Sequence, residues 1–172
     1  MPVLTGPALV AAALLVVAGA AKVADPANTV GALRALHLPS SPALVRCGAA
    51  AEAVIGAAAI LVGGAFLWAL VAASYAAFAG FVVAALRAGT MIGSCGCFGH
   101  EDTPPHPLHV ALDLALVGVA AAAAAQGLVP AEAIADDPGQ GVVVVALAGL
   151  ALYLVYAAFV DLPRASARSH RH

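Results

Sequence analysis

The most chemically reactive part of the sequence is a polar loop, "MIGSCGCFGHEDTPPHP" (residues 91–107), in which Cys95 and Cys97 stand one residue apart. A disulfide between them would close a small, strained ring, and Gly96 supplies the backbone freedom that such a ring needs. A strained disulfide is easily reduced, which suits thiol–disulfide exchange better than stapling of a fold. We therefore predict a redox-active pair. The alternative is that both cysteines are small apolar residues at a helix interface.

The same loop also carries the residue types of a metal site. Cys95, Cys97, His100 and either His106 or His109 would offer four ligands of the kinds that zinc or copper accepts. Their spacing differs from the usual zinc patterns. The sequence therefore favours thiol chemistry and keeps a metal- or haem-binding membrane protein as an alternative function.

The rest of the chain is far more apolar than this loop. Of its 172 residues, 63% are hydrophobic and only 9% are charged, whereas a soluble domain has about 25% charged residues. A helix needs about 20 residues to cross a hydrocarbon core of roughly 30 Å. The stretches that satisfy this are residues 4–24, 44–63, 65–86, 108–127 and 141–160. The alternating pattern of a β-barrel is absent, and no basic patch indicates nucleic-acid binding.

These spans predict an all-α integral membrane protein, in which an antiparallel four-helix transmembrane bundle is followed by a fifth, C-terminal transmembrane helix. The expected divisions are a bundle at residues 1–129, an acidic loop with the fifth helix at 130–162, and a basic, disordered tail at 163–172. Gly63 and Gly64 alone join the second and third spans. We expect these two spans to form a tight antiparallel hairpin.

All seven positively charged residues fall on one side of this bundle. They flank the loop at residues 25–41, precede the cysteine loop or lie in the tail: Lys22, Arg34, Arg46, Arg87, Arg164, Arg168 and Arg171. The positive-inside rule makes this side cytoplasmic. We therefore predict a multi-pass protein of the cell membrane whose cysteine loop lies in the cytoplasm. The loop at 25–41 also has the apolar spacing of a short interfacial helix.

Alternating crossings bring the end of the first span, the start of the second, the end of the third and the start of the fourth to one membrane face. The chemistry-bearing residues expected there are Lys22, Arg46, Cys47, Glu52, Arg87, Cys95, Cys97, His100, His106, His109 and Asp113. Glu52 and Asp113 would lie well inside their helices, where an ionisable group is costly unless it is paired or hydrated. Lys22 is the expected partner of Glu52.

His109 and Asp113 are spaced i and i+4, so they share one helix face and the carboxylate could orient the imidazole. One hypothesis is that these two residues, with Lys22 and Glu52, handle protons and tune the thiols. The other is that they form a structural polar knot that ties three helices together. Cys47 could resolve a mixed disulfide, although a lone cysteine near a helix end more often acts as a small hydrophobe.

Three short motifs, taken in their order, are similar to a known family. "GAAKVADP" closes the first span, "AAAEAVIG" lies early in the second, and "SCGCFG" precedes the fourth. Together they resemble the MauE/DoxX-like membrane proteins over residues 4 to about 127, and the cysteine motif is the specific part. The resemblance implies a redox-associated protein of the lipid bilayer that supports disulfide formation through a thioredoxin-like partner.

By the same resemblance, Cys95 and Cys97 match the family's redox motif, and polar positions of the helices are matched by Lys22, Glu52, His109 and Asp113. The electron partner would be a thioredoxin-like protein or a quinone, and the sequence identifies neither. A disulfide-forming role would place the cysteines outside the cell, whereas the charges place them inside, which favours passing reducing equivalents outward. A third hypothesis is a non-catalytic assembly factor, for which both cysteines would be dispensable.

Overall fold

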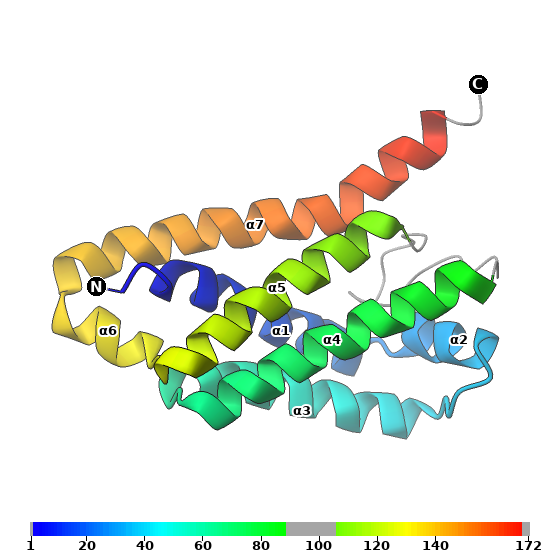
Figure 1. The fold of residues 1–172 in the computed structure, drawn as a ribbon. Helices are drawn as coiled ribbons and strands as arrows, with labels where there is room; N and C mark the ends of the chain where they lie inside the picture. The colour runs from blue at the N-terminus through cyan, green and yellow to red at the C-terminus, as the bar shows by residue number, and fades with distance from the viewer. Residues whose placement is uncertain (1, 89–105, 170–172) are drawn as a thin grey trace.

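The computed structural model describes residues 2–88 and 106–169, with side chains described as far as residue 158. All regular elements in this part of the chain are helices, drawn in Figure 1. They are α1 (Thr5–Ala24), α2 (Ala27–Ala35), α3 (Pro42–Leu61), α4 (Ala65–Ala88), α5 (Pro107–Gln126), α6 (Pro130–Asp136) and α7 (Pro138–Ser169). The predicted cysteines Cys95 and Cys97 and the predicted ligand His100 lie outside the described residues.

Five of these helices are long and apolar enough to cross a membrane. Within the described residues these spans are Thr5–Ala24, Pro42–Leu61, Ala65–Ala88, Pro107–Gln126 and Pro138–Ala158. Each overlaps one predicted span, with ends that differ by at most a few residues. The all-α integral membrane fold is therefore confirmed. The predicted interfacial helix corresponds to α2, and a short helix, α6, lies in the acidic loop.

The helix ends follow from local chemistry. Ser41 caps α3 by accepting a hydrogen bond from the Leu44 amide at 3.2 Å, and Pro42 occupies the first turn, where no amide hydrogen is needed. Gly63 and Gly64 connect α3 to α4, with φ angles of +63° and +88°. Only glycine adopts such angles without strain, so the two glycines fix the position of the turn.

Helix α1 lies directly against α3 because two glycines remove the side chains between them. A Cβ atom added to Gly19 would lie 2.5 Å from the Ala49 carbonyl oxygen, and one added to Gly56 would lie 2.6 Å from the Ala12 carbonyl oxygen. The backbones are therefore closer than a larger residue would permit. Such small-residue contacts drive helix association in lipid, where the hydrophobic effect between helices is lost.

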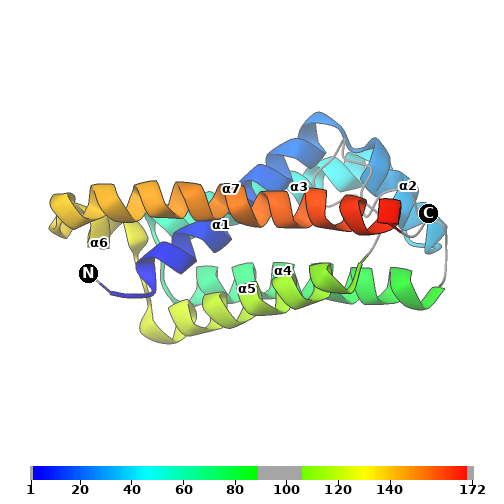
Figure 2. The ribbon, with the colours of Figure 1, turned by 90° about the horizontal axis from the view of Figure 1, so that it is seen from above.

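The bundle is built from two extensive helix pairs, α1 with α3 and α4 with α5. Figures 1 and 2 show that α3 and α4 meet at their shared turn and then diverge. The predicted tight hairpin is thus correct at the Gly63–Gly64 turn and wrong along the length of the helices. The reason is that each helix packs more closely on another helix. Helix α3 packs on α1 through Gly19 and Gly56, and α4 packs along α5.

One carbonyl group ties the turn between α3 and α4 to the segment after α5. The Leu128 oxygen accepts hydrogen bonds from the Gly64 amide at 3.2 Å and from Trp68 Nε1 at 2.8 Å. Gly63 lies so close to Leu128 that an added Cβ atom would overlap its carbonyl oxygen. We call this end of the bundle, which also carries α6, the α6 end.

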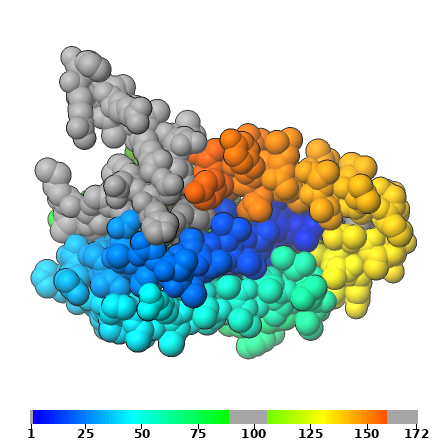
Figure 3. Space-filling model, turned by 180° about the vertical axis from the view of Figure 1, so that it is seen from behind, coloured from blue at the N-terminus to red at the C-terminus, as the bar shows by residue number. Residues whose placement is uncertain are grey.

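The opposite end, where α1 and α4 end, α3 and α5 begin and α2 lies, is called the α2 end. Figure 3 shows the two ends on opposite sides of the elongated molecule, with α6 far from α2. Helix α7 packs on α1 and leaves most of its apolar side chains exposed, as a helix facing lipid would. Its backbone continues to Ser169, whereas the sequence predicted a disordered tail from residue 163. Alanine and arginine in this segment favour helix, which accounts for the continuation.

Candidate functional site

A buried ion pair lies at the α2 end of the bundle, as the sequence predicted. Lys22 Nζ, near the end of α1, is 2.5 Å from Glu52 Oε2 on α3. The lysine side chain is 7% exposed and the glutamate side chain 20% exposed. Both helices are candidate membrane spans, in which an unpaired charge would be costly. Pairing makes both charges tolerable.

An aromatic side chain that the sequence did not single out completes this pair. Lys22 Nζ lies 4.4 Å from the centroid of the Phe78 ring on α4, within the range of a cation–π interaction. Phe78 in turn meets Tyr75 edge to face, with ring centroids 5.9 Å apart and an interplanar angle of 89°. The ammonium group is therefore held between a carboxylate and an aromatic face, on three different helices.

Tyr75, the ring partner of Phe78, is buried beside the ion pair. Its hydroxyl donates a 2.6 Å hydrogen bond to the Ala11 carbonyl oxygen of α1. The charges of both Asp113 and Glu52 act on this hydroxyl. Tyr75 therefore links α4 to α1 within the field of both carboxylates. Nothing in the residue's sequence context distinguishes it from the other tyrosines.

His109 and Asp113 are buried on the inward face of α5, at 0% and 2% exposure. Both side chains therefore face the interior of the bundle and not acyl chains. Together with Lys22 and Glu52 they give the α2 end four ionisable side chains from α1, α3 and α5.

The two histidines at the start of α5 form a reciprocal cap. His106 Nδ1 accepts from the Leu108 amide at 3.1 Å, and His109 Nδ1 accepts from the His106 amide at 3.3 Å. Because Nδ1 is the acceptor in both rings, each neutral imidazole carries its proton on Nε2. A metal ligand at Nε2 would need the opposite tautomer. The cap therefore favours hydrogen bonding over metal binding for these histidines.

No group of three or more His, Cys, Asp or Glu side chains is arranged to hold a metal ion within residues 2–88 and 106–158. The alternative ligand set of Cys95, Cys97, His100 and His106 lies mostly outside the described residues. It stays a prediction.

The remaining polar residues at the α2 end face outward. Arg46 is exposed and donates from Nε to the Val23 carbonyl oxygen at 3.3 Å, which ties the start of α3 to the end of α1. Arg87, at the end of α4, is also exposed. Cys47 is an exposed free cysteine. Its two predicted roles, a resolving cysteine or a small hydrophobe near a helix end, both stay predictions.

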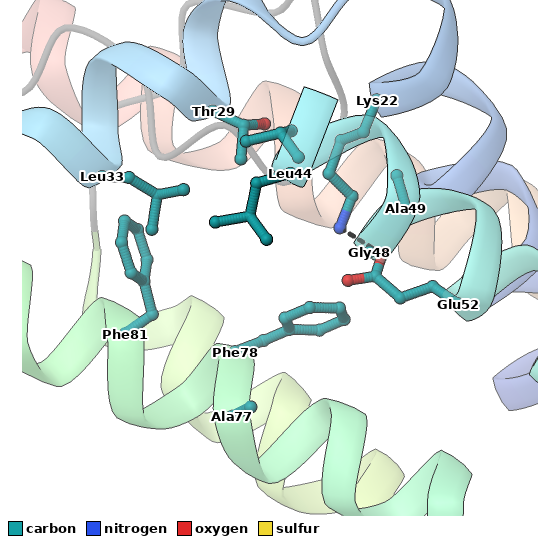
Figure 4. Close-up of a pocket in the computed structure, with 11 residues that line it drawn as sticks. Lys22, Thr29, Leu33, Leu44, Gly48, Ala49, Glu52, Ala77, Phe78 and Phe81 are labelled. Carbon is teal, nitrogen blue, oxygen red and sulfur yellow. Dashed lines mark ion pairs between the residues drawn. The ribbon is translucent and has the colours of Figure 1, made fainter. Parts of the chain in front are cut away.

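A cavity of about 310 Å³ opens beside the ion pair, where α3 and α4 diverge. Figure 4 shows Lys22 and Glu52 on one side of the cavity, with Leu33 and Phe81 across from them. The complete lining is Lys22, Thr29, Leu33, Leu44, Val45, Gly48, Ala49, Glu52, Ala77, Phe78 and Phe81. The wall is thus mostly apolar, and its two charges neutralise each other.

The comparisons with known proteins give one match. The family model described as "Methylamine utilisation protein MauE" matches residues 1–126 of the chain. No curated protein matched, and no solved structure matched. The matched range covers α1 to α5 and therefore contains every residue of the site described above.

Proposed function

Because the chain belongs to the MauE family, we propose that it is a membrane-embedded thiol–disulfide redox protein that acts through the Cys95-Gly96-Cys97 loop. Its five apolar helices make it a multi-pass membrane protein. Family membership supports a role in methylamine utilisation at the level of the family description. The thiol chemistry is our proposal from the residues.

The observation that carries this proposal is the buried polar cluster at the α2 end. Segment 89–105, which holds both cysteines, is connected to the last residue of α4 and to the cap of α5, and both connections are at this end. Buried ionisable groups in membrane helices are costly and mark functional sites by default. The cluster therefore lies where the chain enters and leaves the cysteine segment.

The proposed reaction is an exchange between this thiol pair and a thioredoxin-like partner. A partner thiolate attacks one sulfur of the Cys95–Cys97 disulfide, forms a mixed disulfide and releases the other sulfur as a thiolate, which takes up a proton. The partner's second thiolate then attacks the mixed disulfide, so the partner leaves oxidised and the pair is left as two thiols. The reverse sequence passes two electrons to an oxidised partner.

In this proposal the buried groups serve the thiols in two ways. Lys22, with its positive charge, favours a thiolate nearby, and Asp113 and Glu52 disfavour it. His109, one turn before Asp113 on α5, is the proposed source of the proton that a departing sulfur takes up. Opposing charges of this kind adjust the balance between dithiol and disulfide, which a polar knot without redox function would not need.

We also infer that the α2 end faces the cytoplasm. Lys22, Arg34, Arg46 and Arg87 all belong to elements at this end, and short loops rich in such residues stay inside. With the pair on the cytoplasmic side, passing reducing equivalents outward fits better than oxidising secreted proteins directly.

Thiol trapping in isolated membranes tests the proposal. The chain has three cysteines, so a Cys47→Ser background leaves only Cys95 and Cys97 to label. We expect both thiols to appear together in reduced membranes and to disappear together after mild oxidation. A membrane-impermeant maleimide, applied to intact cells and to inverted vesicles, reports the side of the membrane.

The same experiment separates this proposal from the assembly-factor hypothesis. A Cys95→Ser, Cys97→Ser double variant should lose the protein's cellular function completely, while Cys47→Ser should retain it. Thiols that never change state together, or a double variant with full function, would contradict the redox role.

A further inference from the structure

We propose that the cavity between α2, α3 and α4 binds the head group of a membrane quinone, in its oxidised or reduced form. The inference rests on the proposed function, since it names the electron partner of the thiol pair. It is argued from the cavity, its opening and its two charged groups, all within the described residues.

The cavity has the size and wall of a small-molecule site. Its volume of about 310 Å³ is near the lower end of the roughly 300–1,000 Å³ range of ligand pockets. Two aromatic rings, Phe78 and Phe81, and the aliphatic side chains of Leu33 and Leu44 form most of the wall. A single substituted ring fits such a space, with apolar and aromatic contacts to its faces.

The rim of the cavity opens between two membrane spans. Gly48 on α3 and Ala77 on α4 line the cavity and are exposed, and Leu44 is 53% exposed. Because α3 and α4 are both candidate spans, the gap between them opens on a side of the bundle that lipid would cover. The small side chains at the rim leave room for an apolar tail. A ligand that enters here must be soluble in the bilayer.

The two charged groups, Lys22 and Glu52, match both redox states of a quinone. Lys22 Nζ has three hydrogen-bond donors, and its partner Glu52 Oε2 needs one. Figure 4 shows the other carboxylate oxygen of Glu52 turned toward the cavity. A quinone carbonyl can accept from the ammonium group, and a quinol hydroxyl can donate to the carboxylate.

The neutral ion pair also argues against an anionic ligand. A phosphate or carboxylate would gain from Lys22 but would lie close to the Glu52 carboxylate in a low-dielectric wall, where like charges repel strongly. A plain acyl chain would fill the cavity but would make no hydrogen bond with Lys22 or Glu52. A neutral head group that both accepts and donates hydrogen bonds can pair with Lys22 and Glu52 while its ring contacts the apolar side chains of the wall.

The redox step balances with the thiol pair of the proposed function. When the two thiols are oxidised, two S–H bonds break and one S–S bond forms. The two electrons and two protons that are released convert the quinone's carbonyl groups to the hydroxyl groups of a quinol. The reverse direction reduces the disulfide at the expense of a quinol.

Photolabelling of the purified full-length protein in lipid nanodiscs tests the site, with a short-chain azidoquinone as the probe and decylubiquinone as the competitor. We expect labelled peptides from α3 and α4, and labelling that decylubiquinone suppresses. Labelling that is unchanged by decylubiquinone but suppressed by added phospholipid would show a lipid site and overturn the proposal.

Two matched glycine variants make the test specific. Gly48→Leu would place a side chain at the cavity rim, and Gly80→Leu would place the same side chain on α4 outside the lining. A Cβ atom at either position meets no atom within 4 Å, so both variants keep the backbone packing. We expect Gly48→Leu to weaken azidoquinone labelling about tenfold and Gly80→Leu to leave it unchanged. Equal labelling of both variants would overturn the proposal.

Failure of the site and failure of the proposed function give different results. The Cys95→Ser, Cys97→Ser variant should bind the quinone probe as well as the natural chain does. If the probe binds but the thiols never change redox state, the quinone site is supported and the redox function is contradicted. Thiols that cycle with a soluble partner, in a protein that binds no quinone, leave the function standing and remove the site.

Discussion

The two ends of the bundle are made by the same long helices, but α3 and α4 are joined by a turn at the α6 end and lie apart at the α2 end. At the α6 end, Gly63 and Gly64 turn the chain, and the Leu128 carbonyl oxygen accepts from Gly64 and Trp68. At the α2 end, α3 and α4 have moved apart, and the space between them holds the Lys22–Glu52 ion pair and a cavity of about 310 Å³.

This difference separates polar groups that bond backbone segments together from charges that lie inside the bundle. The polar contacts described at the α6 end are made by backbone groups, the Trp68 indole and the Asp137 carboxylate, which accepts from the Gln140 amide at 3.1 Å. These bonds hold segments of the chain together. The polar contacts of the α2 end include buried charges beside open space, which costs stability and allows chemistry. The α6 end thus anchors α3, α4 and the segment after α5 to one another, whereas the α2 end places an ion pair between diverging helices.

The largest expected effect is at the α6 end. Gly63→Ala should lower the free energy of unfolding by about 3 kcal/mol or more, because left-handed backbone strain adds to overlap with the Leu128 carbonyl group. Gly64→Ala, with φ of +88° and no atom near an added Cβ, should cost only about 1 kcal/mol. Unfolding in mixed detergent measures both. Equal losses would mean that contact with Leu128 does not close this end.

At the α2 end, Lys22→Met should cost about 2 kcal/mol. This is below the about 3–5 kcal/mol of a fully buried pair, because the Glu52 side chain is 20% exposed. The Lys22→Met, Glu52→Gln double variant should recover part of the loss, since no unpaired charge remains. A double-mutant cycle in the same detergent assay measures the coupling. Strictly additive losses would show that the pair does not interact.

Trp68→Phe tests the indole bond of the α6 end. We expect a loss of about 1 kcal/mol, the usual net value of one hydrogen bond, because the Leu128 oxygen keeps its bond from the Gly64 amide. Tyr153→Phe on α7, at a side chain that is 66% exposed, is the control and should change nothing. A loss of several kcal/mol in Trp68→Phe would give the indole a larger role than one bond.

His106→Ala tests the cap at the start of α5. It should cost about 1 kcal/mol or less, as loss of a helix cap does, and His106→Ser should restore most of this by accepting the same amide hydrogen bond. Hydrogen exchange of the first turn of α5 reports the effect locally. If the serine variant exchanged as fast as the alanine variant, the imidazole would have a role beyond capping.

The number and order of the membrane helices could be predicted from the sequence because hydropathy and length decide them in lipid. The Lys22–Glu52 pair was also predictable, since alternating crossings bring the end of the first span and the start of the second to one face. Burial of Asp113 followed from the cost of a charge in acyl chains.

The divergence of α3 and α4, and hence the cavity, could not be predicted. Alanine covers most helix faces, so no stripe of large residues indicates which helices pair. Gly19 and Gly56 bring α1 against α3, but in the sequence they look the same as Gly48 or Gly80, where an added Cβ atom would meet no atom within 4 Å. Phe78 owes its contact with Lys22 to the geometry of three helices, and no local motif records it.

The central claim is that the buried charges of the α2 end act on the thiol pair, and the reduction potential of Cys95 and Cys97 tests it most directly. Three proteins are compared, all carrying Cys47→Ser: the parent chain, an Asp113→Asn variant, and a Glu132→Gln variant that changes an acid of the α6 end. Membranes that contain each protein are equilibrated with glutathione buffers, and free thiols are then trapped with maleimide. Removal of the Asp113 charge should favour the thiolate and raise the potential by about 30 mV, a tenfold change in equilibrium constant, while Glu132→Gln leaves it unchanged. The same potential in all three proteins would contradict the account.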